Sequence, residues 1–163
     1  MKKGMIAPVA TADLVDEFGA DLRVSELQMQ NFGGHKAFAG PIATIHCHLD
    51  KGLVKQTLNS PGEGRVLVVD GEGDLKTALC GDMIAAAAVK NGWAGVVING
   101  AIRDSATIKG MAIGMKAMGT TPRKSAKDAA GETDVELNFG GITWRPGDVL
   151  HADADGVVLL PAE

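Results

Sequence analysis

The stretch RVLVVDGEGDLKTALCGDMIAAAAVKNGWAGVVING, residues 65–100, decides the fold of this chain. The apolar run 65–70 at its start and the apolar run 94–100 at its end both have the composition of buried strands. The Ala-rich segment 81–92 between them predicts a helix that stops at Asn91-Gly92. Strand, helix and strand in this order predict a βαβ unit with parallel strands and a right-handed crossover.

The segments around this unit predict one mixed α/β domain over residues 1–163. Before the unit, the patterns indicate a strand at 38–49, a helix at 50–59 and a short helix at 11–18 that Thr11 or Asp13 can cap. After it, they indicate a short helix near 104–109 and strands at 111–120, 134–139, 141–144 and 156–160. Gly-Gly and Pro-Gly turns separate the last of these strands, so the C-terminal third is expected to be antiparallel.

The charge balance argues against nucleic acid as a partner. The chain has 16 basic and 20 acidic residues, a formal net charge of −4, so it offers no overall attraction for a polyanion. The polar stretch 121–134 lacks periodicity and is interpreted as a loop. Its basic side chains, Arg123, Lys124 and Lys127, are expected to be solvated.

Length and composition favour a single cytoplasmic domain. The 163 residues match one domain of ~100–200 residues. No apolar stretch approaches the ~18–20 residues that span a bilayer, and the start of the chain lacks the long apolar core of a signal peptide. Cys47 and Cys80 have no CxxC spacing, so we interpret both as buried small apolar residues.

Two weaker motifs do not support a site. Gly71 and Gly73 follow a strand, but the third glycine of a dinucleotide fingerprint would fall at Lys76, and no helix begins at Gly73. His46 and His48 are expected to point to one face of a strand, where two imidazoles could bind zinc. No third ligand is spaced to join them, so a solvent-exposed face is favoured.

The start of the 81–92 helix is the stronger candidate. Gly81, Asp82, Met83 and Ile84 open this helix, and its first N–H groups and positive dipole end can hold a small anion such as a carboxylate. Asp82 alone can also be explained as an acid that stabilises the first turn. An anion site therefore needs a cationic partner nearby.

Arg103 and Asp104 supply such a partner just after the second strand of the βαβ unit. Ligands of open α/β sheets bind beyond the carboxyl ends of parallel strands, where these residues and the start of the helix are expected to meet. Arginine offers a planar fork to a carboxylate, and aspartate offers the hard oxygen that Mg²⁺ or Mn²⁺ prefers. Alternatively, both are surface charges and Asp104 caps the next helix.

Beyond these residues, the whole chain resembles the regulator of ribonuclease activity A family, which includes class II 4-hydroxy-4-methyl-2-oxoglutarate aldolases and whose members were once labelled demethylmenaquinone methyltransferases. The resemblance covers about residues 11 to 161. It rests on NFGG at 31–34, FAGPIATI at 38–45, GRVLVVDG at 64–71, ALCGDMIA at 78–85, NGWAGVVINGAIRD at 91–104, IGMKAMGTTPRKS at 113–125 and NFGGITWRPGDVLHADADGVVLLP at 138–161.

This resemblance implies a domain of the swivelling β/β/α type that assembles as a homotrimer or a dimer of trimers, with the site between subunits. It implies that Gly81, Asp82, Met83 and Ile84 bind substrate, that Arg103 binds substrate and its developing charge, and that Asp104 binds the divalent metal. The ribonuclease regulator lacks an acid after its arginine, whereas this chain keeps Arg103-Asp104. One departure is Asp50-Lys51, where the family commonly has Asp-Asn.

The resulting hypothesis is a metal-dependent lyase that acts on a small 2-oxo acid through a metal-stabilised pyruvate enolate. It would cleave 4-hydroxy-4-methyl-2-oxoglutarate to pyruvate and decarboxylate oxaloacetate. Longer aldolases of the family have a C-terminal extension that supplies an acid, whereas this sequence stops at Glu163. The general acid/base is thus left open. Asp82, directly or through a water, is the best local candidate for the proton carrier, and Glu26 or Asp16 of a neighbouring subunit are alternatives.

Three other functions remain to be weighed. A Schiff-base aldolase would need a desolvated lysine, and the expected helical setting gives Lys76 and Lys90 no reason for a lowered pKa. A non-catalytic regulator would bind and inhibit ribonuclease E through its acidic surface and would need no metal. Methyl transfer has no support beyond the incomplete glycine motif at Gly71 and Gly73.

Overall fold

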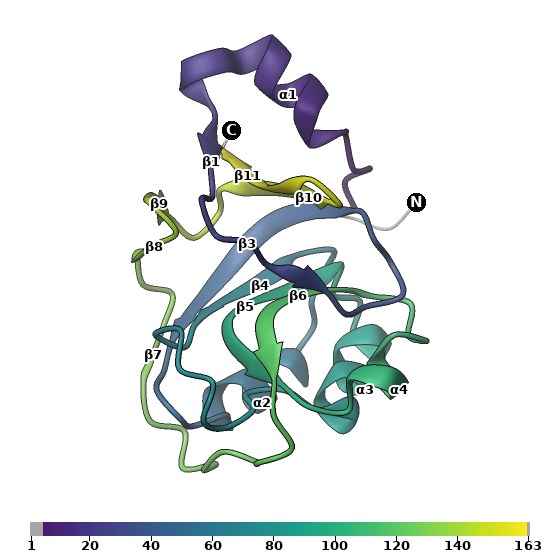
Figure 1. Ribbon diagram of the computed structural model, residues 1–163, viewed down its shortest axis with the longest axis vertical. Coiled ribbons are helices and arrows are strands. Elements are labelled where there is room, and N and C mark those ends of the chain that lie inside the picture. The colour runs from purple at the N-terminus through teal and green to yellow at the C-terminus, as the bar shows by residue number, and fades with distance from the viewer. Residues whose placement is uncertain (1–4, 163) are drawn as a thin grey trace.

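A mixed sheet runs through the protein, in the strand order β1-β11-β10-β3-β4-β5-β6-β2, with β7 pairing against β3 outside this path. The computed structural model describes residues 5–162, so residues 1–4 and 163 of the expected domain lie outside the described part. In Figure 1, helices α2, α3 and α4 lie together below the parallel strands, while α1 lies at the opposite end of the molecule.

The predicted βαβ unit is confirmed. Strand β4 (Val66–Asp70) lies parallel to β5 (Gly95–Ile102), and α3 (Asp82–Lys90) connects them. Strand β6 (Gly114–Thr120) continues the parallel pairing beyond β5, after the short helix α4 (Ser105–Ile108). All four strands β3 to β6 therefore end at the same edge of the sheet.

Strand β3 (Phe38–His46) joins the parallel half to an antiparallel half. Its second part pairs in parallel with β4, from Ile42 to His46, and is followed by α2 (Gly52–Leu58). Its first part, Phe38 to Pro41, pairs antiparallel with β10 (Val149–Asp153). This one long strand therefore belongs to both halves of the sheet (Figure 1).

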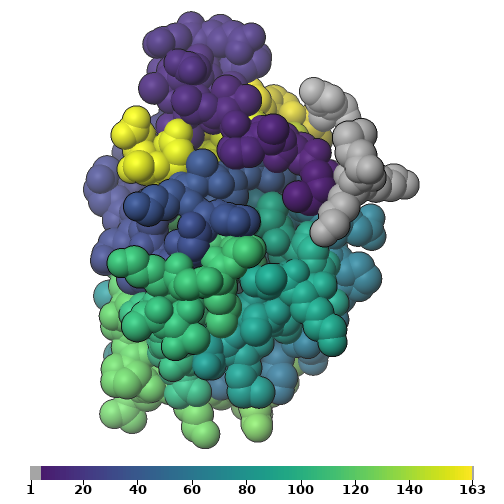
Figure 2. All heavy atoms as spheres, turned by 90° about the vertical axis from the view of Figure 1, so that its right-hand side faces the viewer, coloured from purple at the N-terminus to yellow at the C-terminus, as the bar shows by residue number. Residues whose placement is uncertain are grey.

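The antiparallel half contains the C-terminal strands, as expected. Strand β11 (Gly156–Leu160) lies between β10 and β1 (Arg23–Val24), and α1 (Thr11–Phe18) with the short 3-10 turn η1 (Gly19–Asp21) packs beside them. Figure 2 shows the purple α1 segment as a projection at this end of the molecule. The remaining strands are β2 (Gln30–Asn31), β7 (Glu132–Thr133) and the separate hairpin of β8 (Leu137–Phe139) and β9 (Ile142–Trp144).

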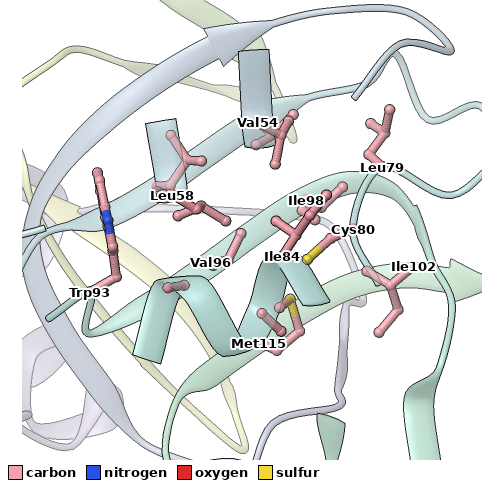
Figure 3. Packing of buried hydrophobic residues seen from close by; sticks show 14 of the residues in the cluster. Val54, Leu58, Leu79, Cys80, Ile84, Trp93, Val96, Ile98, Ile102 and Met115 are labelled. Carbon is pink, nitrogen blue, oxygen red and sulfur yellow. The ribbon is translucent and has the colours of Figure 1, made fainter. Parts of the chain in front are cut away.

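Two buried clusters lie on opposite sides of the strands. The larger one packs α2 and α3 against the parallel strands and includes the residues that Figure 3 labels: Val54, Leu58, Leu79, Cys80, Ile84, Trp93, Val96, Ile98, Ile102 and Met115. The second lies under the antiparallel half and includes Phe38, Val68, Trp144, Leu150 and Leu159. Successive residues of a strand point to opposite faces, so Leu67 joins the first cluster and Val68 the second.

Several sequence predictions need correction. The expected strand 38–49 ends at His46, and Leu49 has a φ of 55°, which is not compatible with a continuing strand. Strands β1, β2, β7 and β10 were not predicted. In β10, His151 and Asp153 break the apolar alternation because they bind backbone N–H groups near the N-terminus, those of Val9 and Thr11.

Thr11 does not cap α1, because Ala10 occupies the N-cap position and Thr11 binds Asp153 through both its N–H and its hydroxyl. Asp13 does not cap it either, since it lies within the first turn and no side chain caps this helix. In the part of the chain that the structure describes, no helix is long and apolar enough to cross a bilayer.

Candidate functional site

A pocket of about 230 Å³ opens at the carboxyl edge of the parallel strands. Its walls come from four segments that follow β3, β4, β5 and β6 in turn, so the topology brings together residues far apart in the sequence. The lining residues are Lys51, Lys55, Ala78, Cys80, Gly81, Asp82, Met83, Ile84, Arg103, Asp104, Lys124 and Lys127. All six predicted site residues are among them.

Asp104 links the end of β5 to the start of α3. It has a left-handed backbone with φ 57° and ψ 35°, which aspartate tolerates better than most residues. It occupies the N-cap position of α4, as the alternative interpretation expected, but its side chain does not cap that helix. Its Oδ2 instead accepts the Asp82 N–H at 3.0 Å. The carboxylate therefore satisfies one of the open donors of α3.

The next N–H groups of α3 remain available. Ala85 is the first residue of this helix to donate back into it, to the Gly81 carbonyl at 3.0 Å. Among residues 5–162, the N–H groups of Met83 and Ile84 have no acceptor. They belong to the positive end of the helix dipole, so this part of the pocket can hold a small anion.

Gly81 allows the close contact between these two segments. A Cβ at this position would lie 2.9 Å from Asp104 Oδ2 and 3.4 Å from both Cγ and Nε of Arg103. The φ of Gly81 is −127°, which any residue can adopt, so glycine is needed here for space and not for conformation. A larger residue would move the carboxylate or the guanidinium.

The guanidinium of Arg103 is largely free to bind a ligand. Its Nε lies 3.9 Å from Asp104 Oδ2, too far for a hydrogen bond, and its Nη1 donates to the Pro122 carbonyl at 3.5 Å. The side chain is 39% exposed. Most of its five donors therefore remain open for a carboxylate or an oxyanion.

Four lysines complete the pocket, and the sequence interpretation missed all of them as site residues. Lys51 and Lys55 come from the start and the last turn of α2, and Lys124 and Lys127 come from the segment after β6. Lys124 and Lys127 are exposed to solvent, as expected, but they also line the pocket. The one sequence signal was Lys51 itself, which departs from the asparagine that the resemblance implies at this position.

The buried carboxylate of Asp50 holds the segment 121–131 in place. Its two oxygens accept N–H groups from Gly52, Asp128, Ala129 and Ala130, at 2.8 to 3.4 Å. Burial alone would raise the pKa of Asp50, but these four donors outweigh it and lower the pKa below its ordinary value. The backbone of the loop that carries Lys124 and Lys127 is thus fixed, while the two lysine side chains stay exposed.

The acids in the pocket fit a divalent cation. Among the described residues 5–162, no three His, Cys, Asp or Glu side chains gather into a metal centre. Mg²⁺ needs no such cage, because one or two carboxylates with water and substrate oxygens satisfy it. Asp104 engages only Oδ2 in the protein, and Asp82 lines the same pocket, so these hard oxygens suit Mg²⁺ or Mn²⁺.

The other histidine and glycine candidates lie elsewhere. His46 pairs with Glu72 at 3.1 Å, and His48, beyond the end of β3, pairs with Asp74 at 2.9 Å, so the two imidazoles do not share a strand face. The N–H groups of Gly71 and Gly73 both donate to the Asn99 carbonyl and are closed to a phosphate.

The remaining titratable candidates also fall outside the pocket or are inert. Cys47 and Cys80 are buried as predicted, and burial raises the pKa of each thiol to about 12. Lys76, Lys90, Asp16 and Glu26 do not line the pocket of their own chain.

Comparisons with known proteins agree with this architecture. A family model described as RraA-like, Aldolase/RraA, matches residues 11–159. The structure of S-adenosylmethionine:2-dimethylmenaquinone methyltransferase from Geobacillus kaustophilus HTA426 is 49% identical over 95% of this chain and 96% of that chain, with a TM-score of 0.91.

Two further structures are similar. The RNA-processing inhibitor RraA from Thermus thermophilis is 42% identical over 96% of this chain and 94% of that chain, with a TM-score of 0.92. Streptomyces coelicolor RraAS2, an unusual member of the RNase ES inhibitor RraA family, is 26% identical over 96% and 81% of the two chains, with a TM-score of 0.73. With its family match and this shared fold, the chain belongs to the RraA-like, or Aldolase/RraA, family.

Proposed function

We propose that this chain is a divalent-metal-dependent lyase that cleaves 4-hydroxy-4-methyl-2-oxoglutarate to pyruvate and also decarboxylates oxaloacetate. The observation that carries the proposal is the meeting of Arg103, Asp104 and the open start of α3 in one pocket. Both reactions leave the enolate of pyruvate, so a site that stabilises this anion serves both. The family includes aldolases by description, which agrees with this chemistry.

The residues of the pocket would bind and orient the 2-oxo acid. The open guanidinium donors of Arg103 would hold the substrate carboxylate and the negative charge that develops beside it. The free N–H groups of Met83 and Ile84 would donate to the same anionic end. A divalent cation held by Asp104 would supply Lewis-acid stabilisation of charge on the 2-oxo oxygen.

The cleavage requires a proton carrier at the other end of the substrate. A base removes the proton of the 4-hydroxyl group, the C3–C4 bond breaks, and its electron pair forms the enolate of pyruvate. A proton returned to C3 then completes the second pyruvate. Asp82 is the acid of this chain that lines the pocket beside Asp104, so we assign the proton transfer to it, directly or through water.

The resemblance further suggests a cytoplasmic homotrimer or dimer of trimers, in which Asp16 or Glu26 of a neighbouring subunit would be the alternative proton carriers. Light scattering on the purified protein measures the assembly directly. A monomer with full activity would remove the neighbouring subunit from the proposal.

The direct test follows oxaloacetate decarboxylation with Mg²⁺, with EDTA, and in Asp104→Ala. We expect activity to be lost with EDTA and in Asp104→Ala, and to be kept in the control Asp13→Ala, which changes an exposed acid on α1. Activity that survives both EDTA and Asp104→Ala would show that the metal-dependent assignment is wrong.

A second candidate is a regulator that binds ribonuclease E and inhibits it through protein contact. It is favoured by the 42% identity to a protein described as an RNA-processing inhibitor. Such contact needs no metal, so binding to ribonuclease E should persist in Asp104→Ala while decarboxylation is lost. Pull-down with purified ribonuclease E separates the two functions, and no binding by the wild type would remove the regulator.

Methyl transfer is not favoured, although one similar structure is described as a methyltransferase. The glycine motif that could have held a cofactor donates its Gly71 and Gly73 N–H groups to Asn99. The pocket is instead cationic, which suits an acidic substrate.

A further inference from the structure

We propose that Lys51, together with Lys55, Lys124 and Lys127, binds a second carboxylate of the substrate, and that Lys51 determines a preference for dicarboxylic over monocarboxylic 2-oxo acids. This inference rests on the proposed function, because it concerns the same pocket. None of these four lysines is required for the bond cleavage itself.

The charge balance of the pocket supports a second anion. Five cationic side chains line it, from Arg103 and the four lysines, against the two carboxylates of Asp82 and Asp104. None of the four lysines forms an ion pair within the part of the chain that the structure describes. Cations that repel one another in a concave site are stabilised by a ligand that brings negative charge.

The position of Lys51 is fixed by the backbone on both of its sides. Its N–H donates to the Ala126 carbonyl at 2.8 Å, and its Nζ donates to the Ser125 carbonyl at 3.3 Å. Its neighbour Asp50 anchors the same loop through N–H groups of residues 128–130. The ammonium group therefore stays at the pocket wall and does not move freely in solvent.

The surroundings of Lys51 are unfavourable to its charge. Partial burial is the main cause that lowers the pKa of Lys51, and the nearby charges of Arg103, Lys124, Lys127 and Lys55 lower it further. A carboxylate placed among these groups would reverse the balance.

The pocket continues along α2 into a second hollow that Arg103 does not line. Lys55 and Lys127 line both this pocket and a neighbouring hollow of about 360 Å³, which Gly52, Gln56 and Asn59 complete along α2. A substrate whose first carboxylate occupies Arg103 and the start of α3 can extend its other end toward α2. A terminal methyl group there would leave the lysines without a partner, whereas a carboxylate would bind them.

The test compares two ligands of equal chain length, neither of which has the 4-hydroxyl group that cleavage needs. Isothermal titration with Mg²⁺ present measures the Kd of 2-oxoglutarate and of 2-oxopentanoate, which has a methyl group in place of the distal carboxylate. We expect the wild type to bind 2-oxoglutarate at least about tenfold more tightly, which is what one charged hydrogen bond contributes. In Lys51→Met, we expect this ratio to fall to about threefold or less, with the Kd of 2-oxopentanoate unchanged.

Three further variants make the comparison specific. Lys51→Arg should keep most of the preference because it keeps the charge, and Lys51→Asn, with the residue common in the family, should lose it as Lys51→Met does. Lys90→Met, at the far end of α3, removes a lysine outside the pocket and should leave both Kd values unchanged. If the Lys51 variants do not fold, Lys124→Met removes another lysine of the same pocket, and the same fall in the Kd ratio is expected.

Several results would overturn the inference. These are equal Kd values for the two ligands in the wild type, no measurable binding of 2-oxoglutarate, or an unchanged ratio in folded Lys51→Met. The proposed function fails separately: selective binding of 2-oxoglutarate without any turnover of oxaloacetate would refute the lyase and keep the lysine assignment.

Discussion

Two arginines, Arg23 in the antiparallel half of the sheet and Arg103 at the end of a parallel strand, are used in opposite ways. In the antiparallel half, Arg23 forms an ion pair with Asp148 at 2.8 Å and also donates to the Thr143 carbonyl, so its guanidinium is committed to the fold. In the parallel half, Arg103 has only a carboxylate at 3.9 Å and a long contact to a carbonyl. The guanidinium donors of Arg23 are therefore used within the fold, whereas most of those of Arg103 remain free to bind a ligand.

This difference follows from topology. Antiparallel strands return on themselves, so the polar groups at a strand end meet a neighbouring strand or turn that satisfies them. Parallel strands all end at one edge, where the segments that follow them converge without a further strand to pair with. Open hydrogen-bonding groups therefore gather at the carboxyl edge of the parallel strands.

Trp144→Ala should show the largest effect and should be confined to stability. Trp144 is fully buried, stacks on Phe139 with ring centroids 4.5 Å apart, and donates its Nε1–H to the Phe139 carbonyl. Its removal should lower the free energy of unfolding by about 3–5 kcal/mol, measured by urea denaturation. The kcat of the folded fraction should not change; a large fall in kcat would show that the two halves are not separate in function.

Arg103→Lys should show the reverse pattern. Lysine keeps the charge but cannot reproduce the planar fork, so we expect kcat/KM for oxaloacetate to fall about 100-fold, or about 2.7 kcal/mol. The melting temperature should stay close to that of the wild type. The control Arg23→Lys should lower the melting temperature and leave kcat/KM intact, and a wild-type rate in Arg103→Lys would remove this arginine from the site.

Asp50→Asn should reduce both stability and substrate binding. An amide cannot accept all four N–H groups, so the variant should lose about 1–3 kcal/mol of stability at pH 7. It should also weaken substrate binding, because the segment with Lys124 and Lys127 would no longer be fixed. Denaturation curves and the KM for oxaloacetate measure the two effects; loss of stability with an unchanged KM would mean that Asp50 serves the fold alone.

The same carboxylate predicts a pH dependence with a definite sign. The pKa of Asp50 is lowered in the folded protein, so its contribution to stability is complete above its unfolded value of about 3.9. The contribution is lost as the pH falls below that value and through the lowered folded pKa. The difference in the free energy of unfolding between wild type and Asp50→Asn should therefore shrink as the pH falls below about 4. Urea denaturation at a series of acidic pH values measures it.

Gly81→Ala should have the smallest effect of the four substitutions. The added Cβ would approach Asp104 Oδ2 to 2.9 Å, so the carboxylate must shift by a few tenths of an ångström. We expect a fall in kcat/KM of about tenfold, or about 1.4 kcal/mol. Gly156→Ala is the matched control in the antiparallel half, because nothing lies within 4 Å of its Cβ position; equal losses in both would contradict a local effect.

The sequence was sufficient for the parallel half because its signals are local. Apolar runs around an Ala-rich helix predicted the βαβ unit, and the rule for strand ends placed Gly81 near Arg103. Strand β10 could not be found in this way. His151 and Asp153 look like surface residues until Val9 and Thr11, 142 positions away, supply their partners.

The lysines of the pocket were missed for a related reason. Lys51 and Lys127 come together because the Asp50 carboxylate binds N–H groups 78 to 80 positions further along the chain and because the backbones of residues 49–51 and Ala126 are hydrogen-bonded. Nothing in the polar composition of residues 121–131 indicates that contact. A polar loop without periodicity can be mobile or fixed, and only the position of its hydrogen-bond partner decides between the two.

The hydrogen bond from Asp82 N–H to Asp104 Oδ2 also makes the start of α3 a natural reporter of the pocket. Any ligand that draws on the Asp104 carboxylate changes the acceptor of this one amide, and the change requires no turnover. The NMR chemical shift of the Asp82 amide therefore reports ligand binding independently of catalysis. It would distinguish a protein that binds a ligand without turning it over from one whose pocket binds nothing.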